Sequence, residues 1–179
     1  MQIKVEKNVN SIEGLCVITP AVHGDARGYF TETYNKNDME EAGIFIDFVQ
    51  DNQSASVKGV LRGLHRQKKY PQTKLVRCIS GSVYDVAVDM RTGSKTYGKW
   101  FGIELSAENK KQLLIPKGFA HGFLVLSDYA EFCYKCDDFY HPNDEDGIPY
   151  NDPKIGVNWN IPRGMKIILS EKDKNWNNL

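Results

Sequence analysis

The amino-acid sequence predicts an all-β fold, a sandwich or a barrel, with a few short helices. Three observations predict it: strand-like segments dominate from about residue 50 onward, turn residues separate them, and helix signals are scarce. Short strands at this spacing pack as sandwiches or barrels. The chain has 179 residues, of which 41% are hydrophobic, so we expect a single domain, residues 1–179, with its own core.

The expected strands consist of apolar, β-branched and aromatic residues between turns. They span residues 74–79, 83–90, 98–105, 112–115, 122–126 and 130–140. Residues 80–82 form the turn between the first two, and Gly93 marks the next turn. In the strand 83–90, Val86 and Val88 alternate with Asp85 and Asp89, a period of two that predicts one face toward a core.

Two short helices are expected. In residues 37–42, Asn37 and Glu40 have the spacing of a capping box, and Ser170 and Asp173 repeat that spacing near the C-terminus. The polar residues 143–153 predict a long loop rather than a domain boundary.

Composition and charge exclude several classes of protein. The 23 basic and 23 acidic side chains balance, whereas nucleic-acid-binding proteins usually carry a basic excess. No apolar run follows a basic start, and no stretch approaches 18 apolar residues, so we expect neither a signal peptide nor membrane association. The four cysteines then predict reduced thiols and a cytoplasmic location. A local basic patch still suits a small anion such as a diphosphate.

Two familiar motifs are incomplete. Residues 93–99 copy a phosphate-binding loop, but Trp100 stands where a magnesium-binding hydroxyl belongs, and no helix pattern follows. Cys133 and Cys136 have the spacing of half a zinc site, but no second pair exists, which favours two packed thiols.

Histidines and strand-borne polar residues are the better candidates. His65 lies in residues 61–67 and His121 in residues 116–123, without the close histidine pair of a metal-binding barrel. This favours a non-metal role for His65, although a structural histidine fits the same pattern. Lys74 and Tyr134 interrupt strand-like segments, as expected of a barrel that holds a ligand in its mouth.

Two arginines flank glycines. Arg27 lies in residues 25–28 and Arg62 in residues 61–63. The planar guanidinium group suits the oxygens of a diphosphate, but an arginine taken alone is more often a solvated surface charge.

Together these segments resemble the dTDP-4-dehydrorhamnose 3,5-epimerase family over nearly the whole chain. The matching motifs, in order, are GDARG (24–28), FVQDN (48–52), VLRGLH (60–65), KLVR (74–77), YDVAVD (84–89), LIPKGFAHGF (114–123), AEFCYK (130–135) and LSEKD (169–173). The resemblance implies a cupin-like jelly-roll barrel, a homodimer and a reaction without cofactor or metal. The implied reaction epimerises a dTDP-4-keto-6-deoxyhexose at carbon-3 and carbon-5, giving dTDP-4-dehydro-L-rhamnose for dTDP-rhamnose and cell-surface polysaccharide biosynthesis.

The resemblance also implies roles for particular residues. The catalytic set is His65 as base, Asp173 as its partner, Tyr134 as proton donor on the opposite face, and Lys74 beside the substrate ketone. The substrate-binding set is Arg27, Glu32, Gln50, Asn52, Arg62, His121, Tyr140, Glu145 and Lys172, with the arginines on the diphosphate and Tyr140 stacked on thymine. This chemistry fits the residue types: histidine titrates near working pH, a carboxylate fixes its tautomer, and a cation stabilises the enolate.

The chain departs from the family pattern at Arg66, at the residues 70–71 (Tyr-Pro), and in its short C-terminal extension. These departures affect substrate choice more than chemistry. Three alternatives stay open: a ketoisomerase or single-carbon epimerase on the same fold, a metal-dependent cupin oxygenase, and a binding module without turnover. The intact set of His65, Asp173, Lys74 and Tyr134 favours epimerisation.

Overall fold

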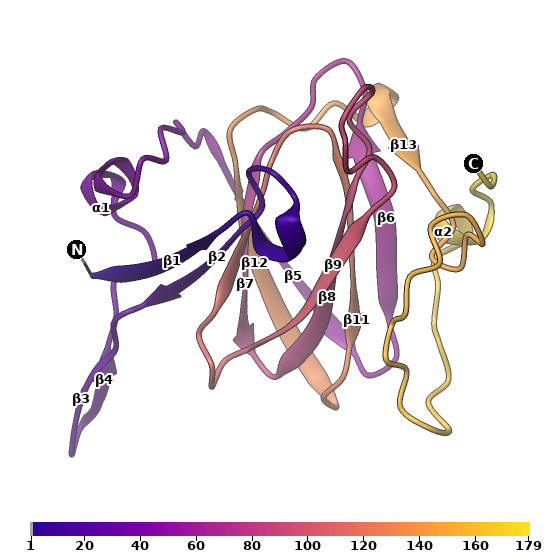
Figure 1. The fold of residues 1–179 in the computed structure, drawn as a ribbon. Helices are drawn as coiled ribbons and strands as arrows, with labels where there is room; N and C mark the ends of the chain where they lie inside the picture. Colours follow the sequence, from indigo (N-terminus) through magenta and orange to yellow (C-terminus); the bar gives the residue numbers. More distant parts are fainter. Residues whose placement is uncertain (1) are drawn as a thin grey trace.

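Two antiparallel sheets lie face to face in the computed structural model, which describes residues 2–179 (Figure 1). The six-stranded sheet contains, in spatial order, β1 (Ile3–Lys7), β2 (Cys16–Pro20), β10 (Gln112–Ile115), β7 (Lys74–Ser80), β12 (Tyr129–Cys136) and β5 (Gln50–Val57). The five-stranded sheet contains β13 (Glu145–Gly147), β6 (Leu61–Gln67), β11 (Phe119–Val125), β8 (Ser82–Asp89) and β9 (Trp100–Ser106). Successive strands often cross from one sheet to the other, which makes the fold a cupin-like jelly roll and confirms the predicted all-β class.

Short elements lie at the two sides of the barrel. They are the hairpin β3 (His23–Asp25) and β4 (Gly28–Phe30), the helices α1 (Lys36–Glu41) and α2 (Glu171–Lys174), and the 3₁₀ turns η1 (Val9–Ser11) and η2 (Pro142–Asp144). In Figure 1 the hairpin and α1 lie on one side of the barrel, and β13 and α2 lie on the other. Within residues 2–179, no helix has the length and apolar character needed to cross a membrane.

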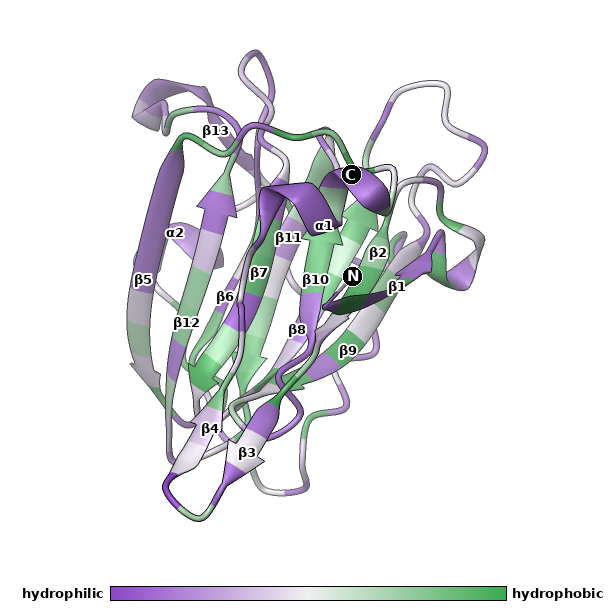
Figure 2. Cartoon of the chain, turned by 90° about the vertical axis from the view of Figure 1, so that its left-hand side faces the viewer, coloured by the Kyte–Doolittle hydropathy of each residue, from purple (hydrophilic) through white to green (hydrophobic). Residues whose placement is uncertain are grey.

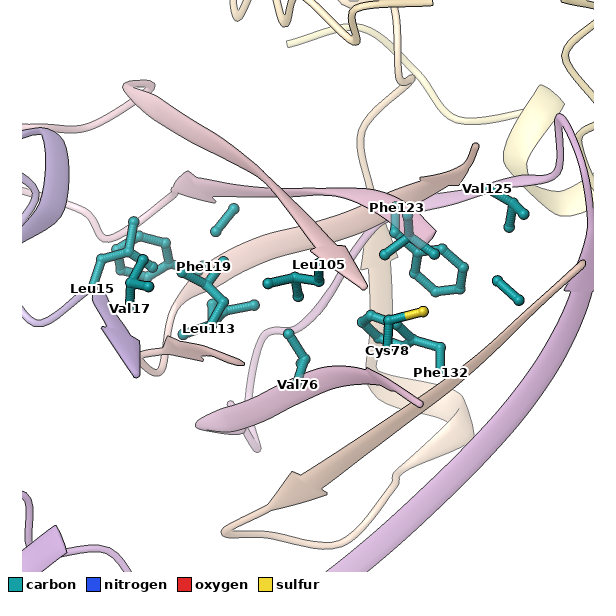
Figure 3. Close-up of a cluster of buried hydrophobic side chains, with 14 of the residues drawn as sticks. Leu15, Val17, Val76, Cys78, Leu105, Leu113, Phe119, Phe123, Val125 and Phe132 are labelled. Carbon is teal, nitrogen blue, oxygen red and sulfur yellow. The ribbon is translucent and has the colours of Figure 1, made fainter. Parts of the chain in front are cut away.

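The main core fills the space between the sheets (Figure 3). Phe123 and Phe132 stack there with ring centres 4.3 Å apart, and Val76 and Leu113 are fully buried beside them. Each such side chain stabilises the fold by about 1.5–3 kcal/mol relative to its exposed state. Both rings of this aromatic pair also line the cavity between the sheets.

The strand β8 is buried on both faces. Val83 and Ala87 belong to the core between the sheets, whereas Val86 and Val88 pack under the C-terminal segment with Trp159. The sequence predicted that one face of this strand meets a core and the other meets solvent. The two faces instead meet two different cores.

A third apolar cluster covers the outer face of the six-stranded sheet. Met39 of α1 and Ile44 pack there against Leu75 and Leu114. Figure 2 shows α1 in front of the hydrophobic central strands, while the edge strand β5 is hydrophilic over much of its length. The predicted helix is real, but its N-cap is Asn35, whose side chain accepts from the backbone N–H of Asn37 and Asp38.

Three sequence-based assignments were wrong. The expected strand 122–126 begins at Phe119, and the expected strand 130–140 ends at Cys136. The expected loop 143–153 contains β13, which pairs with β6. A strand of three residues has no periodicity that a sequence pattern can show.

Candidate active site

A cavity of about 550 Å³ opens between the sheets on the side of β13 and α2. The strands β6, β7, β11 and β12 supply its walls, and the C-terminal segment covers part of its mouth. Its lining includes the predicted residues Arg62, His65, Lys74, His121, Tyr134, Tyr140, Glu145, Lys172 and Asp173. The fold therefore brings every predicted catalytic residue to one cavity, from positions as far apart as 65 and 173.

The pair of His65 and Asp173 joins the barrel to the C-terminal segment. Ser170 caps α2, donating its hydroxyl to Asp173 Oδ2 at 2.8 Å, and this holds the carboxylate toward β6. Asp173 Oδ1 is hydrogen-bonded to His65 Nε2. Burial alone would raise the pKa of the Asp173 carboxyl, but the bonds with His65 and Ser170 hold it below its ordinary value. An ionised carboxylate only accepts, so in the neutral ring Nε2 carries the hydrogen and Nδ1 has the lone pair.

A second carboxylate faces the other nitrogen of the same ring. Glu145 Oε1 lies 3.6 Å from His65 Nδ1, while Glu145 Oε2 accepts from the Tyr140 hydroxyl at 2.8 Å and from Lys172 Nζ. Burial alone would raise the pKa of Glu145, but Lys172 and Tyr140 hold it below its ordinary value. Glu145 thus places a negative charge where a protonated His65 would be stabilised.

The opposite wall carries a lysine and a tyrosine on neighbouring strands. Lys74 of β7 lies with its Nζ 5.8 Å from the ring centre of Tyr134 of β12. Burial lowers the pKa of Lys74, against the attraction of nearby acidic groups, and burial raises the pKa of Tyr134. Tyr134 therefore remains an O–H donor at neutral pH.

A second histidine–carboxylate pair lies behind the cavity. His121 of β11 is the register partner of His65 on β6, and its Nε2 lies 2.8 Å from Asp85 Oδ2. Asp85 is 0% exposed, and its Oδ1 has no hydrogen-bond partner within the described residues. Sequence reasoning missed Asp85, although a carboxylate at an inward position of an apolar strand was a usable signal.

The predicted residues of β5 lie at the rim and not in the lining. Gln50 donates to the Asn52 amide oxygen at 2.9 Å and accepts from the Tyr140 backbone N–H at 3.0 Å. Arg62 is also held from this strand, since its guanidinium donates to the Ser56 hydroxyl at 3.1 Å. These contacts fix Tyr140 and Arg62 at the mouth of the cavity.

Arg27 and Glu32 are the predicted site residues that this chain does not bring to its own cavity. Arg27 lies in the hairpin and pairs with Asp25, and Glu32 accepts from Asn35 at 3.4 Å. Figure 1 shows that hairpin on the far side of the barrel from α2. Any contact of these residues with substrate therefore has to occur in another copy of the chain.

No three His, Cys, Asp or Glu side chains of residues 2–179 are grouped so as to hold a metal ion. The chemistry that the cavity can perform is proton transfer, because it combines a paired histidine, a half-buried lysine and a protonated phenol. Such a set suits an isomerase that removes and returns protons next to a carbonyl group.

Comparisons with known proteins identify that isomerase family. A family profile described as dTDP-4-dehydrorhamnose 3,5-epimerase matches residues 9–179. The dTDP-4-dehydrorhamnose 3,5-epimerase of Methanothermobacter thermautotrophicus is 53% identical over 93% of this chain and 90% of its own length. The Escherichia coli enzyme of that name is 54% identical over 91% of this chain and 88% of its own. A crystal structure of dTDP-6-deoxy-D-glucose-3,5-epimerase from Legionella pneumophila, in complex with dTDP-4-keto-L-rhamnose, is 49% identical, with a TM-score of 0.91 and coverage of 96% of this chain and 90% of that one.

The chain belongs to the dTDP-4-dehydrorhamnose 3,5-epimerase family, and it is an isomerase. The resemblance predicted from its motifs is thereby confirmed.

Proposed function

We propose that this protein epimerises a dTDP-4-keto-6-deoxyhexose at carbon-3 and carbon-5, giving dTDP-4-dehydro-L-rhamnose, a step of dTDP-rhamnose biosynthesis. The observation that carries the proposal is the shared cavity of His65 with Asp173, Lys74 and Tyr134. The bound sugar nucleotide of the Legionella relative supports the choice of substrate.

In the proposed reaction His65 removes the proton from the carbon beside the ketone through the lone pair on Nδ1. The C–H electron pair moves toward the ketone, and negative charge collects on its oxygen. Lys74 stabilises that charge, because a buried ammonium group has lost its hydration and gains much from an anion. Tyr134 donates its phenolic proton to the carbon from the opposite face, and configuration is inverted. His65 then releases its proton to water and the Tyr134 phenolate takes one up from water. The same steps at the second flanking carbon complete the reaction.

The rim supplies the binding contacts in this proposal. The positive charges of Arg62 and Lys172 lie beside the diphosphate, and the Tyr140 ring stacks on the nucleobase. A cavity of about 550 Å³ lies within the range of 300–1,000 Å³ usual for small-molecule sites. His121 lies on the inner wall of the cavity and contacts the hexose in this proposal.

We also propose that the protein works in the cytoplasm as a homodimer. Four free, buried cysteines suit a reducing compartment. The position of Arg27 away from its own cavity, on a hairpin with exposed Tyr29 and Phe30, supports a second copy of the chain as partner. Neither a nucleic acid nor a membrane is expected as a partner.

Proton exchange in heavy water tests the reaction. We expect the protein, incubated with dTDP-4-keto-6-deoxyglucose, to incorporate deuterium at carbon-3 and carbon-5 and to form the L-configured product by NMR. His65→Asn should abolish exchange at both carbons while still binding dTDP, which checks that the cavity is intact. Exchange at one carbon only would indicate a single-carbon epimerase. Movement of the ketone to another carbon would indicate a ketoisomerase, and binding without exchange would indicate a non-catalytic module.

A further inference from the structure

Trp176 stands behind the pair of His65 and Asp173, in a segment that none of the matching motifs includes. Its indole Nε1–H donates to Asp173 Oδ1 at 3.4 Å, and this oxygen also bonds His65. Its ring meets the imidazole of His65 edge to face, with the centres 6.0 Å apart and an interplanar angle of 64°. Trp176 therefore contacts both members of the pair, and it is not among the residues that line the cavity.

The strand next to His65 is shaped to admit this indole. Gly147 of β13 is the register partner of His65. A Cβ atom at Gly147 would lie 2.2 Å from Trp176 Cε2, so only glycine leaves room for the ring. The Lys172 ammonium lies 5.8 Å from the centre of the same ring. Trp176 is thus seated between β13 and α2 and is not a loose terminal side chain.

We propose that Trp176 is a positioning residue for the proton transfer: it fixes the Asp173 carboxylate and the His65 ring in their mutual orientation and shields their bond from water. This inference rests on the proposed function, since it assigns His65 as the base. A carboxylate that donors hold from two sides has little freedom to rotate, and a base whose ring is fixed meets the C–H bond in a constant geometry.

The charged and titratable groups around His65 determine what a pH profile will report. Asp173 faces Nε2 from α2, Glu145 faces Nδ1 from β13 with Lys172 bound to it, and His121 lies opposite on β11. Trp176→Phe leaves all of these charges in place and deletes one N–H donor to Asp173. A carboxylate with one donor fewer holds an imidazolium more strongly. The acid limb of the kcat/KM profile should then move to higher pH.

Trp176→Phe should also lower kcat by roughly 3- to 10-fold with little change in KM, because the residue touches the base and not the substrate. Trp176→Ala should lower kcat further, since the ring packing is lost as well. Gly147→Ala leaves Trp176 chemically unchanged but displaces its ring, and it should act in the same direction. In the Trp176→Ala background, Gly147→Ala should have almost no additional effect on kcat.

The experiment measures kcat, KM and the pH profile of these variants, together with an NMR titration of the His65 ring without substrate. The chain has four histidines, and His65→Asn identifies the signal of His65. Trp159→Phe is the matched control: it loses an indole hydrogen bond of 2.7 Å to the Tyr150 carbonyl, away from the cavity, and should lower stability without moving the profile.

The inference is supported if Trp176→Phe shifts both the acid limb and the His65 titration while the variant stays folded. It is overturned if Trp176→Phe and Gly147→Ala, both folded, titrate and turn over like the parent protein. If the parent protein shows no proton exchange, the proposed function fails, while the NMR titration still decides whether Trp176 acts on the pair. If Trp176→Ala does not fold, Gly147→Ala and Trp176→Phe carry the test alone.

Discussion

At the scale of single residues, burial sets the charge states on the wall opposite His65. Removing water penalises any charged form, so the pKa of Lys74 falls and the pKa of Tyr134 rises. The phenol consequently keeps its proton until a carbanion-like centre accepts it. In the proposed reaction, desolvation strengthens the attraction between the Lys74 ammonium form and the developing enolate oxygen. The same desolvation would prepare Tyr134 to donate a proton and Lys74 to hold an anion.

In the proposed reaction, the phenol of Tyr134 takes part only in the second half-step of inversion, the return of a proton. Tyr134→Phe keeps the ring in the core and deletes its O–H, while His65 and Lys74 remain. We expect washout of the substrate proton to survive at a measurable fraction of the parent rate. Inverted product should fall by about 100-fold, the contribution of a positioned general acid. Deuterium exchange and product formation are measured by NMR on one sample.

Two outcomes would contradict this role. If exchange and inversion both continued at the parent rate, Tyr134 would be a packing residue. If both fell in equal proportion, the phenol would act before the enolate forms and would not be simply the acid of the opposite face. A normal dTDP affinity of the variant is the control for an intact cavity.

The same residues predict that the reaction needs no metal ion. The charge that a metal would neutralise on the ketone oxygen is assigned to Lys74, and a chelator should therefore leave kcat and KM unchanged. Dialysis against a chelator followed by the exchange assay checks this. Loss of activity that one divalent metal restores would favour the metal-dependent alternative.

At the scale of elements, the loop between β8 and β9 shows why a motif needs its structural setting. Residues 93–99 resemble a phosphate-binding loop in sequence, but the fold uses them to enclose the Asp89 carboxylate. Asp89 is 0% exposed and accepts from the guanidinium of Arg91 and from the hydroxyls of Ser94 and Thr96, both at 2.6 Å. The hydroxyls therefore hold a buried carboxylate and not a nucleotide phosphate.

Asp89→Asn should lower the free energy of unfolding by about 3 kcal/mol, because it leaves a partly buried arginine without its counter-charge. Burial alone would raise the pKa of Asp89, but the hydrogen bonds from Arg91, Ser94 and Thr96 hold it well below its ordinary value. A depressed folded-state pKa contributes stability that is complete above the unfolded pKa of about 4 and is lost as pH falls below it.

Urea unfolding of both proteins between pH 7 and strongly acidic pH checks the prediction. The difference between parent and variant should be largest at neutral pH and shrink in acid. Asp128→Asn is the control, since that side chain is 96% exposed in its pair with Lys58 and should change stability little. A difference that stayed constant with pH would show that the charge of Asp89 is not what stabilises the loop.

Some elements of the fold could be predicted from the sequence, and others could not. The strand 112–115 was predicted with the bounds that β10 has, because clear turn signals on both sides of these four residues define where the strand begins and ends. The β13 strand was missed, because pairing with β6 and not local pattern defines it. The bond between His65 and Asp173 spans 108 positions, so only the resemblance, and no local signal, predicted it. Trp176 was missed for the same reason, because its role arises from contacts across the fold. Asp85 was missed although its inward position on an apolar strand was a usable signal.

At the scale of the whole molecule, the cavity and the hairpin lie on opposite sides of the barrel (Figure 1). The prediction that Arg27 binds substrate and the geometry of one chain are therefore compatible only if the hairpin of a second copy reaches the first copy's cavity. A homodimer satisfies both copies at once, since a two-fold interface gives each cavity its partner's hairpin. An Arg27→Ala homodimer should then bind substrate weakly, with KM raised more than kcat is lowered, although its catalytic residues are intact.

Mixing two impaired proteins tests whether the site is shared between chains. In a heterodimer of Arg27→Ala and His65→Asn chains, shared sites place both changes in one cavity and neither change in the other. After complete subunit exchange about half of the dimers are heterodimers, so roughly a quarter of all sites should be of parent type. At substrate concentrations well below the KM of Arg27→Ala, activity should therefore rise on mixing toward that fraction. If each chain used its own hairpin, no parent-type site would form, and the mixture would show only the mean of the two separate activities. A monomeric parent protein in sedimentation analysis would exclude the shared site directly.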